Sequence, residues 1–193
     1  MSARRSARLA VLACAAVLAL TGCAPDPADE TAPPTAAPVE SRTPTPTASP
    51  TPTAAAARIP GDCRAMLPQD VLAQLRTVPL NDPALGPSGP QADGSLVCIW
   101  RDPAADTTGL VTTISREDRG PALDMLNQLV ADEGFSCYTP DEGTRCEKTW
   151  INPQYPVNDG RTLYWRDGIL IDTQYSNLAP TGYTAGIIAG IFG

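Results

Sequence analysis

Residues 161–175 read RTLYWRDGILIDTQY, two runs of aliphatic, aromatic and β-branched side chains on either side of Asp167-Gly168. Asp-Gly is a favoured pair for a two-residue turn between antiparallel strands, so the segment predicts a β-hairpin. A turn at this position places Trp165 opposite Leu170 and Tyr164 opposite Ile171. The folded part of this chain of 193 residues is therefore expected to be built around antiparallel pairing.

The surrounding sequence predicts further strands and three helices. Two strands are expected over 96–101 and 110–116, and a second hairpin over 136–151. Helices are expected from Leu67-Pro68 to about 75, from Pro121 to a Gly134 cap, and from about 181 to 192. The apolar stripe of the middle helix comprises Leu123, Leu126, Leu129 and Val130. Gly182, Gly186 and Gly190 form a small-residue stripe that we expect to pack on the sheet.

Helices interspersed with hairpins, without a strand–helix–strand rhythm, indicate the α+β class. We predict an antiparallel sheet of about five strands with helices packed on one face and two disulfides. Composition divides the chain into a signal peptide over 1–22, a stalk over 23–57 and a single globular head over 58–193.

The N-terminus has the layout of an export signal. Arg4, Arg5 and Arg8 precede a run of apolar residues over 9–20, which is too short to span a bilayer core of about 30 Å. The closing tetrapeptide, Leu20-Thr21-Gly22-Cys23, resembles the lipobox of bacterial lipoproteins. The resemblance implies cleavage after Gly22, lipid attachment at Cys23 and location on the outer face of the cytoplasmic membrane. The alternative is an ordinary secretory signal with an incidental cysteine.

Residues 24–57 change composition abruptly, since 26 of these 34 residues are Pro, Thr or Ala. Such a segment cannot bury enough apolar surface to offset its ordering entropy, so we expect a disordered stalk. Its reach is roughly 30–35 Å as a coil and up to about 105 Å as polyproline helix. The Thr-Pro alternation over 43–53 also suits O-glycosylation, with a plain linker as the alternative.

After removal of the signal peptide, Cys23 and four cysteines of the head remain. The four in the head are Cys63, Cys98, Cys137 and Cys146. An even count in an exported chain indicates two disulfides, which four cysteines can form in three ways. We favour Cys137–Cys146, because the intervening Pro140-Asp141-Glu142-Gly143 turn sets them opposite each other, and hence Cys63–Cys98. A zinc site is disfavoured, because the chain has no C-x-x-C pair and no histidine.

Short motifs of the head also resemble a group of actinobacterial lipoproteins of unknown function. In that group a lipobox and a Pro/Thr-rich stalk precede a cysteine before a Leu-Pro helix start and a later Cys-x-Trp strand. The corresponding segments here are 63–68 (CRAMLP) and 98–100 (CIW). The resemblance implies an envelope lipoprotein with an α+β head and brings no activity with it.

The composition excludes several function classes. A formal net charge of −7 argues against nucleic-acid binding, and the lack of histidine excludes hydrolases built on that residue. The chain has no G-x-S-x-G, P-loop or G-x-G-x-x-G motif. We therefore assign no catalytic residue, cofactor or metal ligand. The carboxylate pairs Asp102 with Asp106 and Asp132 with Glu133 are the candidates for a glycosidase.

Two proline-rich loops, over 76–95 and 152–158, are the remaining candidates for function. In the second, Tyr155 lies between two prolines, and tyrosine is a common anchor at interfaces; stiff connectors are the alternative reading. We predict a lipid-anchored, non-catalytic head that binds an envelope protein, a polymer or a small ligand, with Tyr155 in the binding surface. The alternatives are a carboxylate-dependent hydrolase of cell-wall glycan and a purely structural or inhibitory surface protein.

Overall fold

The hairpin around Asp167-Gly168 lies within the sheet as predicted. A computed structural model describes residues 57–193, and strands β6 (Asn158–Arg166) and β7 (Ile169–Ser176) pair through this turn. Tyr164 faces Ile171 and Trp165 faces Leu170. Both turn residues have positive φ, which explains the Asp-Gly pair. The signal peptide, Cys23 and the stalk up to residue 56 lie outside the described residues.

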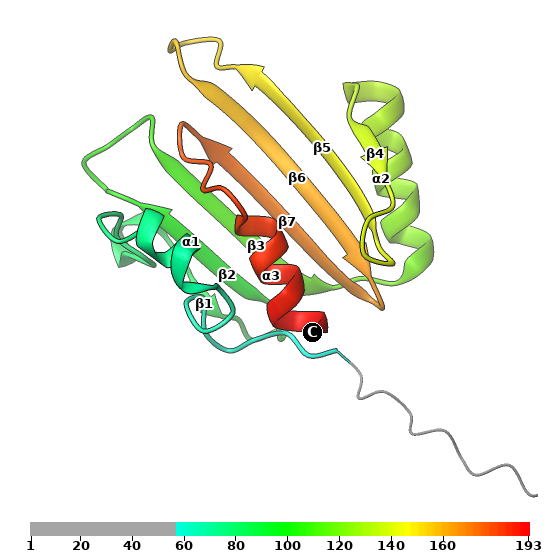
Figure 1. Cartoon of the computed structure of the whole chain (residues 1–193). Helices are drawn as coiled ribbons and strands as arrows, with labels where there is room; N and C mark the ends of the chain where they lie inside the picture. Colours follow the sequence, from blue (N-terminus) through cyan, green and yellow to red (C-terminus); the bar gives the residue numbers. More distant parts are fainter. Residues whose placement is uncertain (1–56) are drawn as a thin grey trace, which may run out of the picture. The chain divides into compact units, whose positions relative to one another are not determined.

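The sheet has seven antiparallel strands rather than about five, in the order β1-β2-β3-β7-β6-β5-β4 (Figure 1). The other strands are β1 (Gly89–Pro90), β2 (Leu96–Arg101), β3 (Gly109–Arg116), β4 (Ser136–Tyr138) and β5 (Thr144–Ile151). The two edge strands have only two and three residues. A segment of two or three residues shows no alternating pattern, so these two strands could not be predicted from the sequence.

The prediction that all helices pack on one face of the sheet is wrong. Helices α1 (Gln69–Gln74) and α3 (Tyr183–Phe192) share a core cluster with Tyr164 and Ile171. Helix α2 (Arg119–Glu133) instead packs with Leu163 and Leu170 in a second cluster. Successive residues of a strand point to opposite faces, so α2 covers the reverse face. In Figure 1, α3 crosses the front of the sheet and α2 runs beside β4.

Helix α2 departs from its expected stripe at one position. Leu126 and Leu129 are buried as predicted, whereas Val130 is exposed and Ala122 is buried. Gly134 ends the helix in a left-handed conformation, as expected. Lys148 on β5 donates to the carbonyl of Glu133, so a cation lies at the C-terminal end of the helix dipole.

The glycine stripe of α3 packs against the chain before α1, not against the sheet. A Cβ at position 190 would lie 2.6 Å from the carbonyl oxygen of Met66, and one at 186 would lie 2.6 Å from Pro68 Cδ. The two glycines therefore let α3 approach the segment that starts at Cys63. Within residues 57–193, no helix combines the length and the apolar character needed to cross a membrane.

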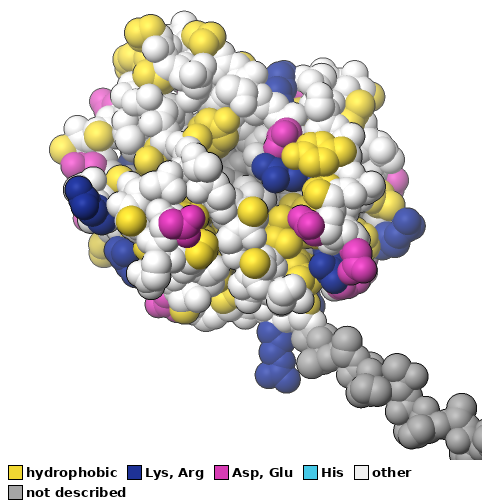
Figure 2. All heavy atoms as spheres, viewed as in Figure 1, with side chains coloured by type: hydrophobic (Ala, Val, Ile, Leu, Met, Phe, Trp, Pro, Cys, Tyr) yellow, Lys and Arg dark blue, Asp and Glu magenta, His cyan; other side chains and the backbone are white. Residues whose placement is uncertain are grey.

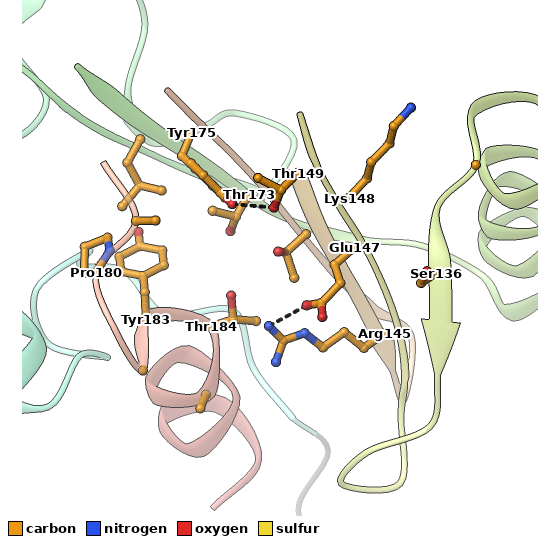
Figure 3. A pocket seen from close by; sticks show the side chains of 16 residues that line it. Ser136, Arg145, Glu147, Lys148, Thr149, Thr173, Tyr175, Pro180, Tyr183 and Thr184 are labelled. Carbon is orange, nitrogen blue, oxygen red and sulfur yellow. Dashed lines mark hydrogen bonds and ion pairs between the residues drawn. The ribbon is translucent and has the colours of Figure 1, made fainter. Parts of the chain in front are cut away.

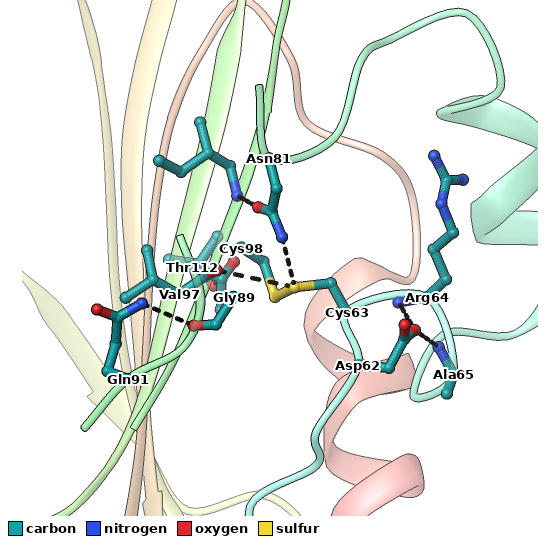
Figure 4. The surroundings of a disulfide bond; sticks show 12 residues. Asp62, Cys63, Arg64, Ala65, Asn81, Gly89, Gln91, Val97, Cys98 and Thr112 are labelled. Carbon is teal, nitrogen blue, oxygen red and sulfur yellow. Dashed lines mark hydrogen bonds between the residues drawn. A yellow bond between two sulfur atoms is a disulfide. The ribbon is translucent and has the colours of Figure 1, made fainter. Parts of the chain in front are cut away.

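Both predicted disulfides are present. Cys63 is bonded to Cys98, with Cα atoms 5.8 Å apart, and ties the segment before α1 to β2 (Figure 4). Cys137 is bonded to Cys146 across the β4–β5 pair, with Cα atoms 4.1 Å apart. Disulfides form and persist in oxidising compartments, so they indicate an extracytoplasmic environment.

The long loop over 76–95 pairs along the outer edge of β2. Asn81 accepts from the Ile99 N–H through Oδ1 and donates its own N–H to the Ile99 carbonyl, both at 2.8 Å. Arg101 N–H donates to the Pro79 carbonyl at 2.9 Å. A short 3₁₀ helix (Pro83–Leu85) and β1 occupy the rest of the loop. This loop therefore covers a sheet edge that would otherwise expose unpaired backbone groups.

Candidate functional site

Two hollows open on the described part of the surface. We call the first the hydroxyl pocket, a cavity of about 600 Å³ between α3 and strand β5. We call the second the Tyr155 groove, of about 400 Å³, where the β2–β3 and β5–β6 loops meet. Figure 2 shows the face that carries α3, with acidic and basic side chains interspersed among uncharged ones.

Hydroxyl groups from strands β4–β7 and from the first turn of α3 line the hydroxyl pocket. They belong to Ser136, Thr149, Thr162, Thr173, Tyr175, Tyr183 and Thr184. In Figure 3 the side chains of Arg145 and Glu147 extend from β5 toward Thr184 on α3, while Lys148 points away. Because hydroxyls both donate and accept hydrogen bonds, this lining suits a small polar ligand.

Two of the three charged side chains that line the hydroxyl pocket are paired with each other, and the third, Lys148, donates to the Glu133 carbonyl. Arg145 Nη2 lies 2.9 Å from Glu147 Oε2, and the guanidinium stacks over Tyr138. Arg145 Nε is buried and has no hydrogen-bond partner among the described residues. No side chain caps the nearby N-terminus of α3. The pocket therefore has donors left for a ligand oxygen, and with Lys148 its lining side chains carry a formal charge of +1.

A buried hydroxyl network supports the floor of this pocket. Thr112 Oγ1 lies 3.0 Å from Thr173 Oγ1 and donates to the Tyr183 hydroxyl at 3.0 Å. Burial raises the pKa of Tyr183, so the phenol stays neutral at ordinary pH. This network holds the first turn of α3 to strands β3 and β7. The pocket could not be predicted from the sequence, because its lining comes from segments far apart in the chain.

The Tyr155 groove crosses one end of the sheet. A row of paired residues on the α2 side of the sheet runs through Arg101, Gly109, Ser176, Asp159 and Trp150. Every member of this row lines the groove. Gly109 carries no side chain, and a Cβ there would lie 3.2 Å from Arg101 Cδ. The Arg101 side chain thus lies over Gly109, and Ser176 and Asp159 separate Gly109 from Trp150 along the row.

Exposed apolar side chains gather at this groove. Among the described residues, six large hydrophobic side chains are exposed, and three of them, Val111, Trp150 and Tyr155, line it. Trp150 is 38% exposed and Tyr155 is 45% exposed. Two aromatic rings left in water on one side of a hollow are typical of binding surfaces.

The loop that presents Tyr155 is held by Asn152. Asn152 Oδ1 accepts from the backbone N–H groups of Gln154 and Tyr155, at 2.8 and 3.0 Å. The Asn152 N–H donates to the Val157 carbonyl, which closes the loop. The same side chain donates from Nδ2 to Asp159 Oδ2 at 2.7 Å. Tyr155 therefore lies in an ordered loop fixed to the acidic residue of the groove.

Asp159 is a buried carboxylate without a cationic partner. It is 9% exposed, and its Oδ1 is buried with no hydrogen-bond partner among residues 57–193. Arg161, two residues along the same face, is bonded to Asp172 at 3.0 and 2.7 Å. The hydrogen bonds that Arg161 donates to Asp172 raise the pKa of Arg161, so the guanidinium stays charged and engaged. The Nη2 atom of Arg101 lies 3.9 Å from Oδ1 of the exposed Asp106.

The predicted site residues fall in different places. Tyr155 lies in the groove, together with Asp106 of the first carboxylate pair, whereas Asp102 accepts from the Ala104 N–H in a loop turn. Asp132 and Glu133 lie at the end of α2 and line neither hollow. Within 57–193 no group of three His, Cys, Asp or Glu side chains could hold a metal ion.

Trp150 and Asp159 are groove residues that sequence reasoning missed. Alternate residues of β5 face α2, and Trp150 continues this alternation near the end of the strand. The sequence therefore contains only a weak signal that its ring is exposed. Comparison with protein-family models, curated proteins and solved structures yields no match for this chain.

Proposed function

We propose that this protein is a lipid-anchored envelope lipoprotein whose head binds a ligand without catalysing a reaction. The observation that carries the proposal is the clustering of Trp150, Tyr155 and Val111 around one groove. Tyr155 lies in a loop already ordered by Asn152, so little conformational entropy is lost when a partner docks. The lipobox-like Leu20-Thr21-Gly22-Cys23 supports the anchor.

The Tyr155 groove is the preferred binding surface over the larger hydroxyl pocket. In the pocket, Arg145 and Glu147 already neutralise each other, Tyr183 is buried and the Tyr175 hydroxyl is bonded to Thr149. In the groove, two aromatic side chains are exposed, and the exposed amides of Gln154 and Gln174 make no hydrogen bond with other described residues. Exposed apolar area and unsatisfied polar groups are the features that a bound ligand can stabilise.

The anchor leads to the first prediction. Cys23→Ala removes the thiol that would receive the lipid, so the protein should leave the detergent phase or accumulate as an uncleaved precursor. Two acyl chains hold a protein stably at a membrane, whereas the acidic chain gains nothing from anionic headgroups. Phase separation and mass spectrometry of the N-terminus provide the measurement. A processed protein that stays in the detergent phase after Cys23→Ala would exclude lipidation at this residue.

Loss of the Tyr155 side chain should weaken binding with little effect on stability. We expect Tyr155→Ala to reduce capture by isolated cell envelope by about 1–2 kcal/mol, and to change the free energy of unfolding by less than about 0.5 kcal/mol. The matched control is Ile151→Ala, because Ile151 is 67% exposed and does not line the groove.

Quantitative co-sedimentation with envelope and urea unfolding measure the two effects. Equal losses of capture for Tyr155→Ala and Ile151→Ala would mean that binding follows general apolar exposure. Cooperative unfolding of Tyr155→Ala under native conditions would mean that the ring belongs to the core. Either result would contradict the proposed binding surface.

A carboxylate-dependent glycan hydrolase is the second candidate. The observation in its favour is that Asp106 and Asp159 line the same groove, one exposed and one buried. Glycosidases use two carboxyl groups in different environments, one of which donates a proton while the other stays ionised. Release of new reducing ends from a glycan, abolished by Asp159→Asn, would favour this activity over simple binding.

A further inference from the structure

We infer that the Tyr155 groove binds an uncharged saccharide chain, whose sugar rings pack on Trp150 and Tyr155 and whose hydroxyl groups exchange hydrogen bonds with Gln154 and Gln174. The inference rests on the proposed function, since it names the ligand class of the same groove. The argument depends on three properties of the groove, namely its aromatic rings, its charge and its unsatisfied polar groups.

The aromatic rings match the shape of a pyranose. A pyranose presents a face rich in C–H groups, whose slight positive charge complements the negative face of an aromatic ring. Trp150 is the penultimate residue of β5 and Tyr155 lies in the loop that follows, so both rings border one side of the groove. Aromatic side chains with a polar edge suit a ligand that is itself apolar on its faces and polar on its rim.

The charge of the groove disfavours an anionic ligand. Its charged side chains are Arg101, Asp106 and Asp159, for a formal charge of −1. Arg101 is already near Asp106, and its Nε donates to the Ala105 carbonyl at 3.3 Å. Arg161 on the same face is bonded to Asp172. A polymer of phosphates or carboxylates would therefore meet a carboxylate with no free cation to balance it.

The polar groups favour hydroxyl donors over a simple cation. Asp159 Oδ1 is buried, so the polar groups that a ligand can reach are the exposed side chains of the groove. Gln154 and Gln174 line the same groove and are exposed, and their side-chain amides make no hydrogen bond with other described residues. An ammonium ion could pair with the carboxylate but would leave these amides unused. A sugar offers several hydroxyls that donate and accept together.

An extended peptide added to the sheet does not fit this place. The row that crosses the groove lies on one face of the sheet, and its members Gly109, Ser176 and Asp159 are paired on both sides. Strand addition needs a free edge, and the free outer edge of β5 over 148–151 borders the groove only at Trp150. The groove therefore recognises a ligand through side chains rather than through a backbone ladder.

The test titrates the full head with a neutral N-acetylglucosamine tetramer while tryptophan fluorescence is recorded. Trp100 is fully buried and Trp165 packs against α2, so Trp150 is the tryptophan whose emission should respond. Tetramethylammonium chloride and polygalacturonate, at matched ionic strength, are the cationic and anionic probes. We expect a saturable change with the neutral sugar, and none with the other two.

Variants locate the site. Trp150→Ala and Tyr155→Ala should each weaken sugar binding about tenfold or more, and Gln174→Ala by about threefold, while Ile151→Ala leaves it unchanged. Calorimetry reports on Trp150→Ala, because that variant removes the fluorescent group. A response to tetramethylammonium alone, to polygalacturonate alone, or an equal loss in Ile151→Ala would overturn the inference.

Failure of this inference can be told apart from failure of the proposed function. If envelope capture depends on Tyr155 but the tetramer does not bind, the groove binds another class of ligand and the binding function stands. If neither the envelope nor the tetramer responds to Tyr155→Ala, both proposals fail. Release of reducing ends from the tetramer would assign hydrolysis to the same sugar site, which keeps the saccharide and replaces the binding function.

Discussion

Replacing Cys63 and Cys98 together by Ala should lower the free energy of unfolding by about 4 kcal/mol. The bond joins residues 35 positions apart, and the loop that it closes contains α1 and the whole segment over 76–95. Constraining a loop of that length removes much of the entropy of the unfolded chain. Both cysteines are also buried in the main core, so their loss costs packing as well.

The matched comparison is the double replacement of Cys137 and Cys146 by Ala. That bond spans only nine positions at the edge of the sheet, so we expect a smaller loss of about 3 kcal/mol. Equilibrium unfolding in urea at fixed pH measures both. A larger loss for the edge pair would mean that the bond before α1 stabilises the head less than loop closure predicts.

The register of the central hairpin could be predicted from the sequence because a local signal determines it. Asp167-Gly168 is a two-residue turn, and both residues adopt the positive φ that such a turn needs. The same reasoning succeeded for Cys137 and Cys146, which face each other across a short turn. Local geometry thus predicted the Cys137–Cys146 bond. Only Cys63 and Cys98 then remained in the head to form the second bond.

The predicted placement of α2 was wrong because we interpreted the strand pattern as that of a sheet covered on one face only. In β6 and β7, Leu163 and Leu170 alternate with Tyr164 and Ile171, and both sets are buried. Apolar residues on both sides of a strand are typical of a sheet covered on both faces. That signal was present in residues 161–175, but it does not say which helix covers which face.

Of the candidate site, only the loop that carries Tyr155 could be predicted from the sequence. Tyr155 stands out in the sequence because prolines flank it, whereas Asp159 and Trp150 become neighbours through the pairing of β5 with β6. Their alignment depends on how the chain turns over 152–157, and Asn152 determines that turn through bonds to Gln154, Tyr155 and Asp159. A side chain that closes its own loop leaves no periodic pattern.

Trp100→Ala should cost about 3–5 kcal/mol of unfolding free energy, the range for removing a large aromatic ring from a core. Trp100 is fully buried on β2, two residues after Cys98, so its ring shares the face of the disulfide. The guanidinium of Arg64 lies 4.8 Å from the ring centroid, and the backbone of Leu80 pairs beside it. The ring therefore contacts the segment before α1 and lies under the loop that covers the sheet edge.

Two comparisons separate the packing of Trp100 from effects on binding. Trp100→Phe keeps an aromatic ring in the same place, so it should cost less than about 1.5 kcal/mol plus a small cavity term. Tyr155→Ala should leave the melting curve nearly unchanged, because its ring is 45% exposed. Envelope capture measured on folded Trp100→Phe should match the parent protein. If Trp100→Ala melts like the parent while Tyr155→Ala unfolds, then the core and the binding surface have been assigned the wrong way round.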